Sequence, residues 1–134
     1  MTDAIRKAIR ELGDPDIARH SAGFFKAGPG QYGEGDRFIG VRVPVIRKLV
    51  RRYRTVELAA LLELLRSDWH EERLFALLGL VSRFEKGGER EKAEIYEAYL
   101  AHTRFINNWD LVDGSAPTIV GGYLWERERD LLYE

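Results

Sequence analysis

Apolar residues recur at spacings of three and four along most of the chain. Between Asp3 and Leu12 these positions are Ala4, Ile5, Ala8, Ile9 and Leu12, which places them on one face of an α-helix. The same spacing predicts further helices over residues 15–27, 44–54, 56–65, 68–86, 89–102, 105–113 and 116–125. No alternation of period two is long enough to predict a strand. The pattern therefore predicts an all-α protein.

Local signals set the expected helix boundaries. Asp14 is a typical N-cap residue and Pro15 suits a first helical position, so a helix is expected to begin there. Pro44 predicts a helix start in the same way, and the glycines before it predict a surface loop over residues 31–43. The expected caps of three later helices are Thr55, Ser67 or Asp68, and Ser115.

About eight short helices joined by short turns favour antiparallel pairs stacked into a right-handed α-solenoid, as in HEAT-like or ARM-like repeats. The segment 68–86 is the most apolar and is expected to be the most buried helix. With 134 residues, the chain is expected to form one domain, residues 1–134.

Composition limits the chemistry that this scaffold can carry. The 21 Lys and Arg residues are balanced by 22 Asp and Glu residues, so a nucleic-acid site must be a local patch. The chain has no cysteine, which excludes disulfides, thiolate metal sites and a cysteine nucleophile.

Metal binding and membrane insertion are not expected either. The segment His70-Glu71-Glu72 would need a second histidine at position 74 to form a zinc motif, but that residue is Leu74. No apolar run approaches the roughly 20 residues that a membrane span needs, and the N-terminus lacks the apolar stretch of a signal peptide. We therefore expect no metal, no membrane and a cytoplasmic protein.

The stretch 105–113 contains an unusual pair for a packed helix. Trp109 and Asp113 are four residues apart, so on a helix both side chains lie on one face. This placement suggests a groove. Two other interpretations stay open: Asp113 could shape the turn before Gly114 or cap the next helix, and Trp109 could belong to the core.

The basic residues after Pro44 form the best candidate patch for DNA. Arg47, Lys48, Arg51, Arg52 and Arg54 share the polar side of one predicted helix, where they could neutralise phosphates. A solvated helix face is the equally weighted alternative. Arg42, in the preceding loop, is a further candidate for contact with a DNA backbone.

Four segments in this order resemble one known family, the AlkD-type DNA alkylation-repair proteins, which are HEAT-like DNA glycosylases. The resemblance covers residues 24–133, and the last of the segments is the most specific. The segments are Phe38-Ile39-Gly40-Val41-Arg42-Val43-Pro44, His70-Glu71-Glu72-Arg73, Ile95-Tyr96-Glu97-Ala98-Tyr99-Leu100 and Asn107-Asn108-Trp109-Asp110-Leu111-Val112-Asp113-Gly114-Ser115-Ala116-Pro117.

The resemblance implies a solenoid whose concave face binds duplex DNA that carries N-alkylated purines. It implies hydrolysis of the N-glycosyl bond of 3-methyladenine and 7-methylguanine without a metal or an organic cofactor. Asp113 would stabilise the oxocarbenium-like sugar and Trp109 would lie against that sugar. The alternative is a non-catalytic helical-repeat module that binds DNA or a protein partner.

Similar proteins continue for several more helices, which supply the other wall of the DNA cleft. The resemblance therefore implies that residues 1–134 form the N-terminal portion of a longer family domain. A homodimer is a second way in which such a cleft could be completed.

Overall fold

The computed structural model describes residues 1–24, 37–106, 111 and 115–125. These residues form α-helices and helical turns, and within them the only β-type pairing is an isolated bridge between Arg37 and Trp69. The all-α prediction is therefore confirmed. The α-helices are α1 (Thr2–Glu11), α2 (Pro15–Phe24), α3 (Val43–Arg52), α4 (Leu58–Leu65), α5 (His70–Lys86) and α6 (Glu89–Ala101).

Two shorter elements follow α6. Thr103–Phe105 forms a 3-10 turn (η1), and residues 115–125 are helical with a π-helical centre at Pro117–Gly121 (η2). Proline has no N–H to donate, so Pro117 suits a helical segment whose hydrogen bonds depart from the α-helical pattern.

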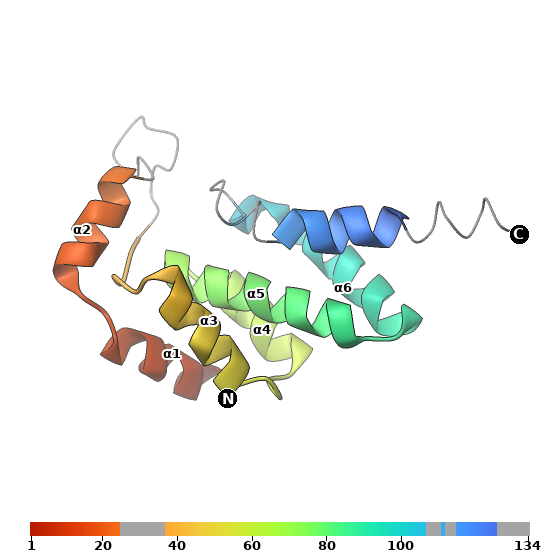
Figure 1. The fold of residues 1–134 in the computed structure, drawn as a ribbon, viewed down its shortest axis with the longest axis horizontal. Helices are drawn as coiled ribbons and strands as arrows, with labels where there is room; N and C mark the ends of the chain where they lie inside the picture. The colour runs from red at the N-terminus through yellow and green to blue at the C-terminus, as the bar shows by residue number, and fades with distance from the viewer. Residues whose placement is uncertain (25–36, 107–110, 112–114, 126–134) are drawn as a thin grey trace, which may run out of the picture.

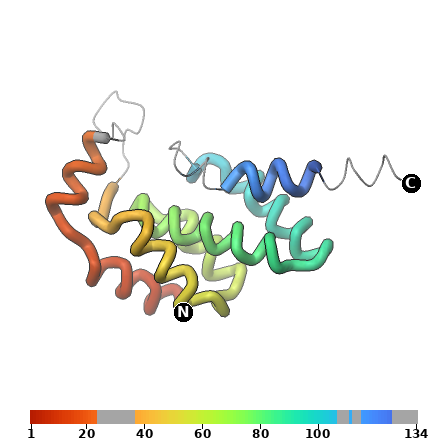
Figure 2. Tube along the Cα trace, viewed as in Figure 1, coloured from red at the N-terminus to blue at the C-terminus, as the bar shows by residue number. Residues whose placement is uncertain are grey.

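Apart from α2, which lies at one end of the molecule, the helices are arranged in two layers (Figure 1). One layer contains α1, α4 and α6; the other contains α3, α5 and the helix 115–125. Contacts run within and between the layers, since α5 packs against α1, α3, α4, α6 and η2. The tube in Figure 2 follows the chain from α1 and α2 at one end to α6 and the helix 115–125 at the other. This progressive stacking fits the predicted helical repeat.

Helix α5 is the centre of the core, as its apolar sequence predicted. Every residue from His70 to Leu80 is buried, because neighbouring helices surround this part of α5. Gly79 allows α4 to approach closely, since a Cβ atom there would lie 2.6 Å from Leu61 Cδ2. The largest fully buried side chains around α5 are Phe75, Ile5, Ile9, Ile46, Leu61, Leu64, Leu65, Leu77, Leu80, Ile95, Leu111 and Ile119.

Two of the predicted helix starts are confirmed. Asp14 Oδ1 accepts hydrogen bonds from the backbone N–H groups of Asp16 at 2.8 Å and Ile17 at 3.4 Å, which is N-cap geometry at the start of α2. Pro44 lies in the first turn of α3, which begins one residue earlier, at Val43.

Three predicted caps were wrong. Helix α4 begins at Leu58 rather than Val56, and neither Thr55 nor Glu57 provides a side-chain cap, because the buried Val56 belongs to a turn whose N–H donates to Tyr53 O. Helix α5 begins at His70, after Trp69, and the predicted cap Ser67 accepts the N–H of Trp69 at 3.0 Å rather than one within the helix. Ser115 is already helical, and its hydroxyl donates to Leu111 O at 2.6 Å instead of capping a new helix.

The predicted helix over residues 105–113 does not begin as expected. Phe105 ends the 3-10 turn η1, and Ile106 leaves helical geometry with φ −108° and ψ 71° while its side chain is buried. The remainder of that prediction, including Trp109 and Asp113, lies outside the described residues, apart from the helical Leu111.

Candidate nucleic-acid interface

Helix α3 presents a basic surface, as its sequence predicted, but it ends at Arg52, so Arg54 lies beyond the helix on which it was predicted. Ile46 and Leu49 are buried against the core, while Val45 and Val50 pack at its edge. The opposite side of the helix is exposed and carries the predicted cations Arg47, Lys48, Arg51 and Arg52. Arg42, also exposed, is the residue just before the helix. We call these five residues, Arg42, Arg47, Lys48, Arg51 and Arg52, the α3 cations.

Several arginines elsewhere in the chain form ion pairs with glutamates, whereas the α3 cations form none with a described carboxylate. On α1, Arg6 and Arg10 lie 3.2 and 3.4 Å from Glu72, and on α5 Arg83 lies 2.8 Å from Glu91. Within the described part of the chain, no carboxylate lies within ion-pair distance of any α3 cation. Arg52 instead lies over the Tyr53 ring, 5.5 Å from its centroid. The positive charge of α3 is therefore available to an external anion.

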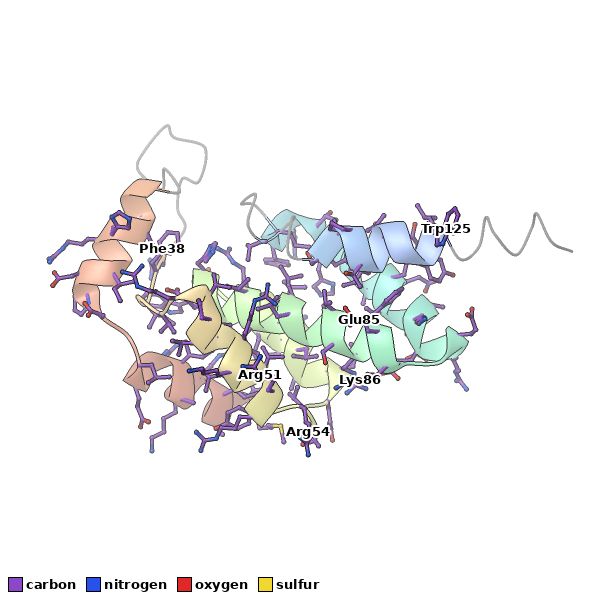
Figure 3. The ribbon with its side chains drawn as sticks, in the orientation of Figure 1. Phe38, Arg51, Arg54, Glu85, Lys86 and Trp125 are labelled. Carbon is purple, nitrogen blue, oxygen red and sulfur yellow. The ribbon has the colours of Figure 1, made fainter. Side chains whose placement is uncertain are left out.

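A hollow of about 220 Å³ lies between side chains of α3 and of the second half of α5. Arg47 and Arg51 line it from α3, and Ser82 and Glu85 line it from α5. Its apolar lining residues are Val50, Leu78 and Val81. Figure 3 shows Arg51 and Glu85 on these two adjacent helices, with Lys86 next to Glu85 and Arg54 beyond the end of α3.

A buried carboxylate holds the segment that leads into α3. Glu71 is only 2% exposed. It accepts backbone N–H groups from Ile39 at 2.9 Å, Gly40 at 2.8 Å and Val41 at 3.1 Å. Hydrogen bonds to a charged acceptor are stronger than neutral ones, so Glu71 fixes the backbone immediately before Arg42 and thus the start of α3.

Gly40 makes this arrangement possible. Its φ of +96° is disfavoured for residues with a side chain, and a Cβ atom there would lie 1.9 Å from Asp14 O. The carbonyl of Gly40 also accepts the N–H of Asp14 at 3.1 Å. The segment before α3 is therefore bonded on one side to the start of α2 and on the other to α5.

Glu72 joins the first layer of helices to α5. It is fully buried and contacts Arg6 and Arg10 of α1, while the Ser67 hydroxyl donates to it at 2.7 Å. Sequence reasoning did not find the roles of Glu71 and Glu72. The available signal was two adjacent carboxylates at the start of an otherwise apolar helix, which we interpreted only as part of an incomplete zinc motif and of a segment shared with the family.

A second polar link lies at the other end of the molecule, between α6 and the helix 115–125. Tyr99 Oη and Ser115 Oγ are 2.8 Å apart in a buried environment, and Ser115 Oγ donates to Leu111 O. Farther along the same two helices, Tyr96 and Tyr123 stack with ring centroids 4.2 Å apart. Together these contacts hold the helix 115–125 against α6.

Burial raises the pKa of the Tyr99 phenol, and the hydrogen bond to Ser115 opposes that change less strongly. A pKa that is higher in the folded state stabilises the protein below the unfolded value of about 10. This stability is lost as pH rises through the folded pKa. We expect Tyr99→Phe to be less stable than the parent at pH 7 by about 1 kcal/mol, because it cannot form the hydrogen bond, but to be destabilised less between pH 8 and pH 11.

Urea unfolding of both proteins at several pH values between 7 and 11 would measure the difference. Equal pH dependence in Tyr99→Phe and parent would mean that Tyr99 does not contribute to alkaline destabilisation.

Other classes of site find no support in the described residues. Among them, no three His, Asp or Glu side chains are close enough together to hold a metal ion. None of the described helices combines the length and the apolar character needed to cross a bilayer.

A comparison with known protein families assigns the chain to one of them. The family model described as "DNA alkylation repair enzyme" matches residues 5–134. The chain belongs to this family. No curated protein and no solved structure matches it. Membership in the DNA alkylation repair enzyme family assigns a general function in DNA alkylation repair, with DNA as substrate.

The family assignment gives the α3 cations a ligand of matching charge, since DNA is a polyanion. The α3 cations form a basic surface, without carboxylate partners in the described part of the chain, on a protein whose substrate is DNA. Trp109 and Asp113, the two candidates for catalysis, lie outside the described residues. Their nearest described neighbours are Leu111 and Ser115, which are bonded to each other, and Ser115 is also bonded to Tyr99.

Proposed function

We propose that this DNA alkylation repair enzyme is a metal-independent DNA glycosylase that acts on purines alkylated at N3 or N7 in duplex DNA. The observation that carries the proposal is the row of cations on α3 without carboxylate partners among the described residues. A formal net charge of −1 gives the whole chain no attraction for a polyanion. DNA binding therefore depends on this local surface.

The chemistry of the lesion explains why a carboxylate is sufficient to promote cleavage of the N-glycosyl bond. Alkylation at N3 or N7 leaves the purine positively charged. When the C1′–N bond breaks, its electron pair returns to the base, which departs neutral and needs no strong acid. Positive charge then develops on the sugar at C1′, and a nearby carboxylate stabilises it.

We assign that carboxylate to Asp113. Water supplies the oxygen that bonds to C1′, and its released proton passes to solvent or to the carboxylate. Trp109 is assigned to the sugar of the lesion, where a cationic nucleotide is attracted to the face of the indole ring. This attraction contributes about 0.5 to 1 kcal/mol in water and more where water is excluded.

The direct test is release of free base. The chain is incubated with methylated duplex, and free 3-methyladenine and 7-methylguanine are measured by chromatography. Release above the spontaneous rate supports a glycosylase. Tight, salt-dependent binding without release would instead support the alternative function, a non-catalytic DNA-binding module.

The α3 surface is tested separately by changing Lys48 and Arg52. We expect Lys48→Gln/Arg52→Gln to weaken duplex binding and to lower the slope of log affinity against log salt, by about 0.9 for each phosphate that the variant no longer neutralises. Filter binding at several salt concentrations measures both.

The matched control is Lys7→Gln/Arg90→Gln, which removes two cations that are paired with glutamates on α1 and α6. Unlike Lys48→Gln/Arg52→Gln, this control is expected to keep most of the salt slope. Equal salt slopes in the two double variants would mean that α3 is not part of the DNA interface.

A further inference from the structure

The hollow between α3 and α5 has the chemistry of an anion site, with one opposing charge. Arg47 and Arg51 are four residues apart and therefore lie one turn from each other on the same face of α3. Both line the hollow, which the hydroxyl of Ser82 and the carboxylate of Glu85 complete from α5. Val50, Leu78 and Val81 supply apolar walls that exclude part of the surrounding water.

A DNA phosphate suits these donors. Two guanidinium groups provide several N–H donors in a planar arrangement that matches phosphate oxygens. A serine hydroxyl on the adjacent helix can donate to the same phosphate from the other wall. Neither arginine has a carboxylate within ion-pair distance among the described residues, although Glu85 lines the same hollow.

We propose that this hollow binds one phosphate of the DNA backbone, with Arg47, Arg51 and Ser82 as donors, and that Glu85 opposes the phosphate and limits the affinity. The proposal rests on the proposed function, because it requires duplex DNA as the ligand. It extends the interface from α3 to α5, where sequence reasoning placed no DNA contact.

The role of Glu85 follows from the geometry of its helix. Leu78, Val81, Ser82 and Glu85 have the spacing of one helix face, and α5 packs against α3. Glu85 is exposed, so solvent screens its charge but does not abolish its effect on a phosphate in the same hollow. The carboxylate repels phosphate on undamaged and damaged duplex alike, and thereby lowers the affinity for both.

Three variants test the hollow by filter binding to an undamaged duplex at several salt concentrations. We expect Glu85→Gln to raise the affinity by about threefold to tenfold, with a larger effect at low salt. We expect Ser82→Ala to lower the affinity by a similar factor, because it cannot form one hydrogen bond to a charged group. Ser82→Thr keeps the hydroxyl and should stay close to the parent.

Glu97→Gln is the matched control for charge. Glu97 is exposed on α6, in the opposite layer, so this variant should bind as the parent does. If Glu97→Gln raised the affinity as much as Glu85→Gln, the effect would be one of net charge and the assignment of Glu85 would be overturned.

Combination with Arg51→Gln shows whether the hollow acts as a unit. If Arg51 and Ser82 hold one phosphate, the double variant Arg51→Gln/Ser82→Ala should bind only slightly more weakly than Arg51→Gln alone. Fully additive effects would overturn the shared phosphate.

The failures of the two proposals are distinguishable. Ser82→Ala and Glu85→Gln could bind as the parent does while Lys48→Gln/Arg52→Gln binds more weakly. That result would overturn the proposed phosphate site in the hollow but leave the proposed role of the α3 surface in place. A parent that does not bind duplex would overturn both.

Discussion

Asp113→Asn is expected to lower the single-turnover rate of 7-methylguanine release by about 10² to 10³. That range is typical when one group that stabilises transition-state charge is removed. Asparagine keeps the size of the side chain and its carbonyl oxygen but has no negative charge. The effect should therefore appear in the rate of bond breaking, with duplex affinity nearly unchanged.

Two measurements separate this result from a folding defect. Thermal unfolding of Asp113→Asn should resemble that of the parent, because the assigned role is electrostatic. Asp68→Asn is the matched control, since Asp68 is exposed in the turn before α5 and its substitution should leave base release intact. Parent-like release by Asp113→Asn would exclude Asp113 as the stabilising carboxylate.

A comparison with Asp110→Asn tests the assignment within the same stretch. Asp110 lies three residues before Asp113, and its sequence position favours a structural role, such as pairing with an arginine on a neighbouring helix. Asp110→Asn should therefore affect stability more than the rate of bond breaking. If Asp110→Asn instead lowered the rate of bond breaking and Asp113→Asn lowered the stability, Asp110 would be the stabilising carboxylate and Asp113 the structural one.

The sequence predicted those features of the fold that depend on residues close together in the chain. The spacing of Ile5 and Ile9 gave α1, and the apolar run after His70 gave the most buried helix, α5. The Asp14 cap was found in the same way, since the residues to which it bonds are two and three positions away. The exposed basic side of α3 was predicted in the same way, because helical periodicity alone places Arg47, Lys48, Arg51 and Arg52 opposite Ile46 and Leu49.

The errors occur where a distant contact overrides a local preference. Thr55 is a good cap in isolation, but burial of Val56 places the start of α4 at Leu58. Ser115 was also expected to be a cap, yet its hydroxyl bonds Leu111 O and lies against Tyr99, sixteen residues earlier. The Tyr99 partner cannot be identified from the residues that immediately surround the serine.

Glu71 shows the same limit most clearly. Its three hydrogen-bond donors are backbone N–H groups 30 to 32 residues earlier in the chain. A sequence does not show which N–H groups will be buried without a backbone partner. The requirement that such groups be paired is visible only when the segment 39–41 lies against the first turn of α5.

Glu71→Gln is expected to lower the free energy of unfolding by about 2 to 4 kcal/mol. One carboxylate oxygen accepts from Gly40 and Val41, and the other accepts from Ile39. An amide replaces one acceptor with an NH₂ group, which faces a backbone donor and leaves it unpaired in a buried site. Each hydrogen bond to a charged group is worth about 1.5 to 3 kcal/mol.

Urea unfolding of Glu71→Gln, the parent and Glu97→Gln measures this effect. Glu97→Gln makes the same chemical change at an exposed position, where the expected effect is within about 0.5 kcal/mol. Because Glu71 also holds the backbone just before Arg42, duplex affinity should fall in Glu71→Gln under conditions where the variant is still folded. If the variant were as stable as the parent, the segment 39–41 would not depend on the Glu71 carboxylate. If it were less stable but bound duplex normally, Glu71 would support the core without positioning α3.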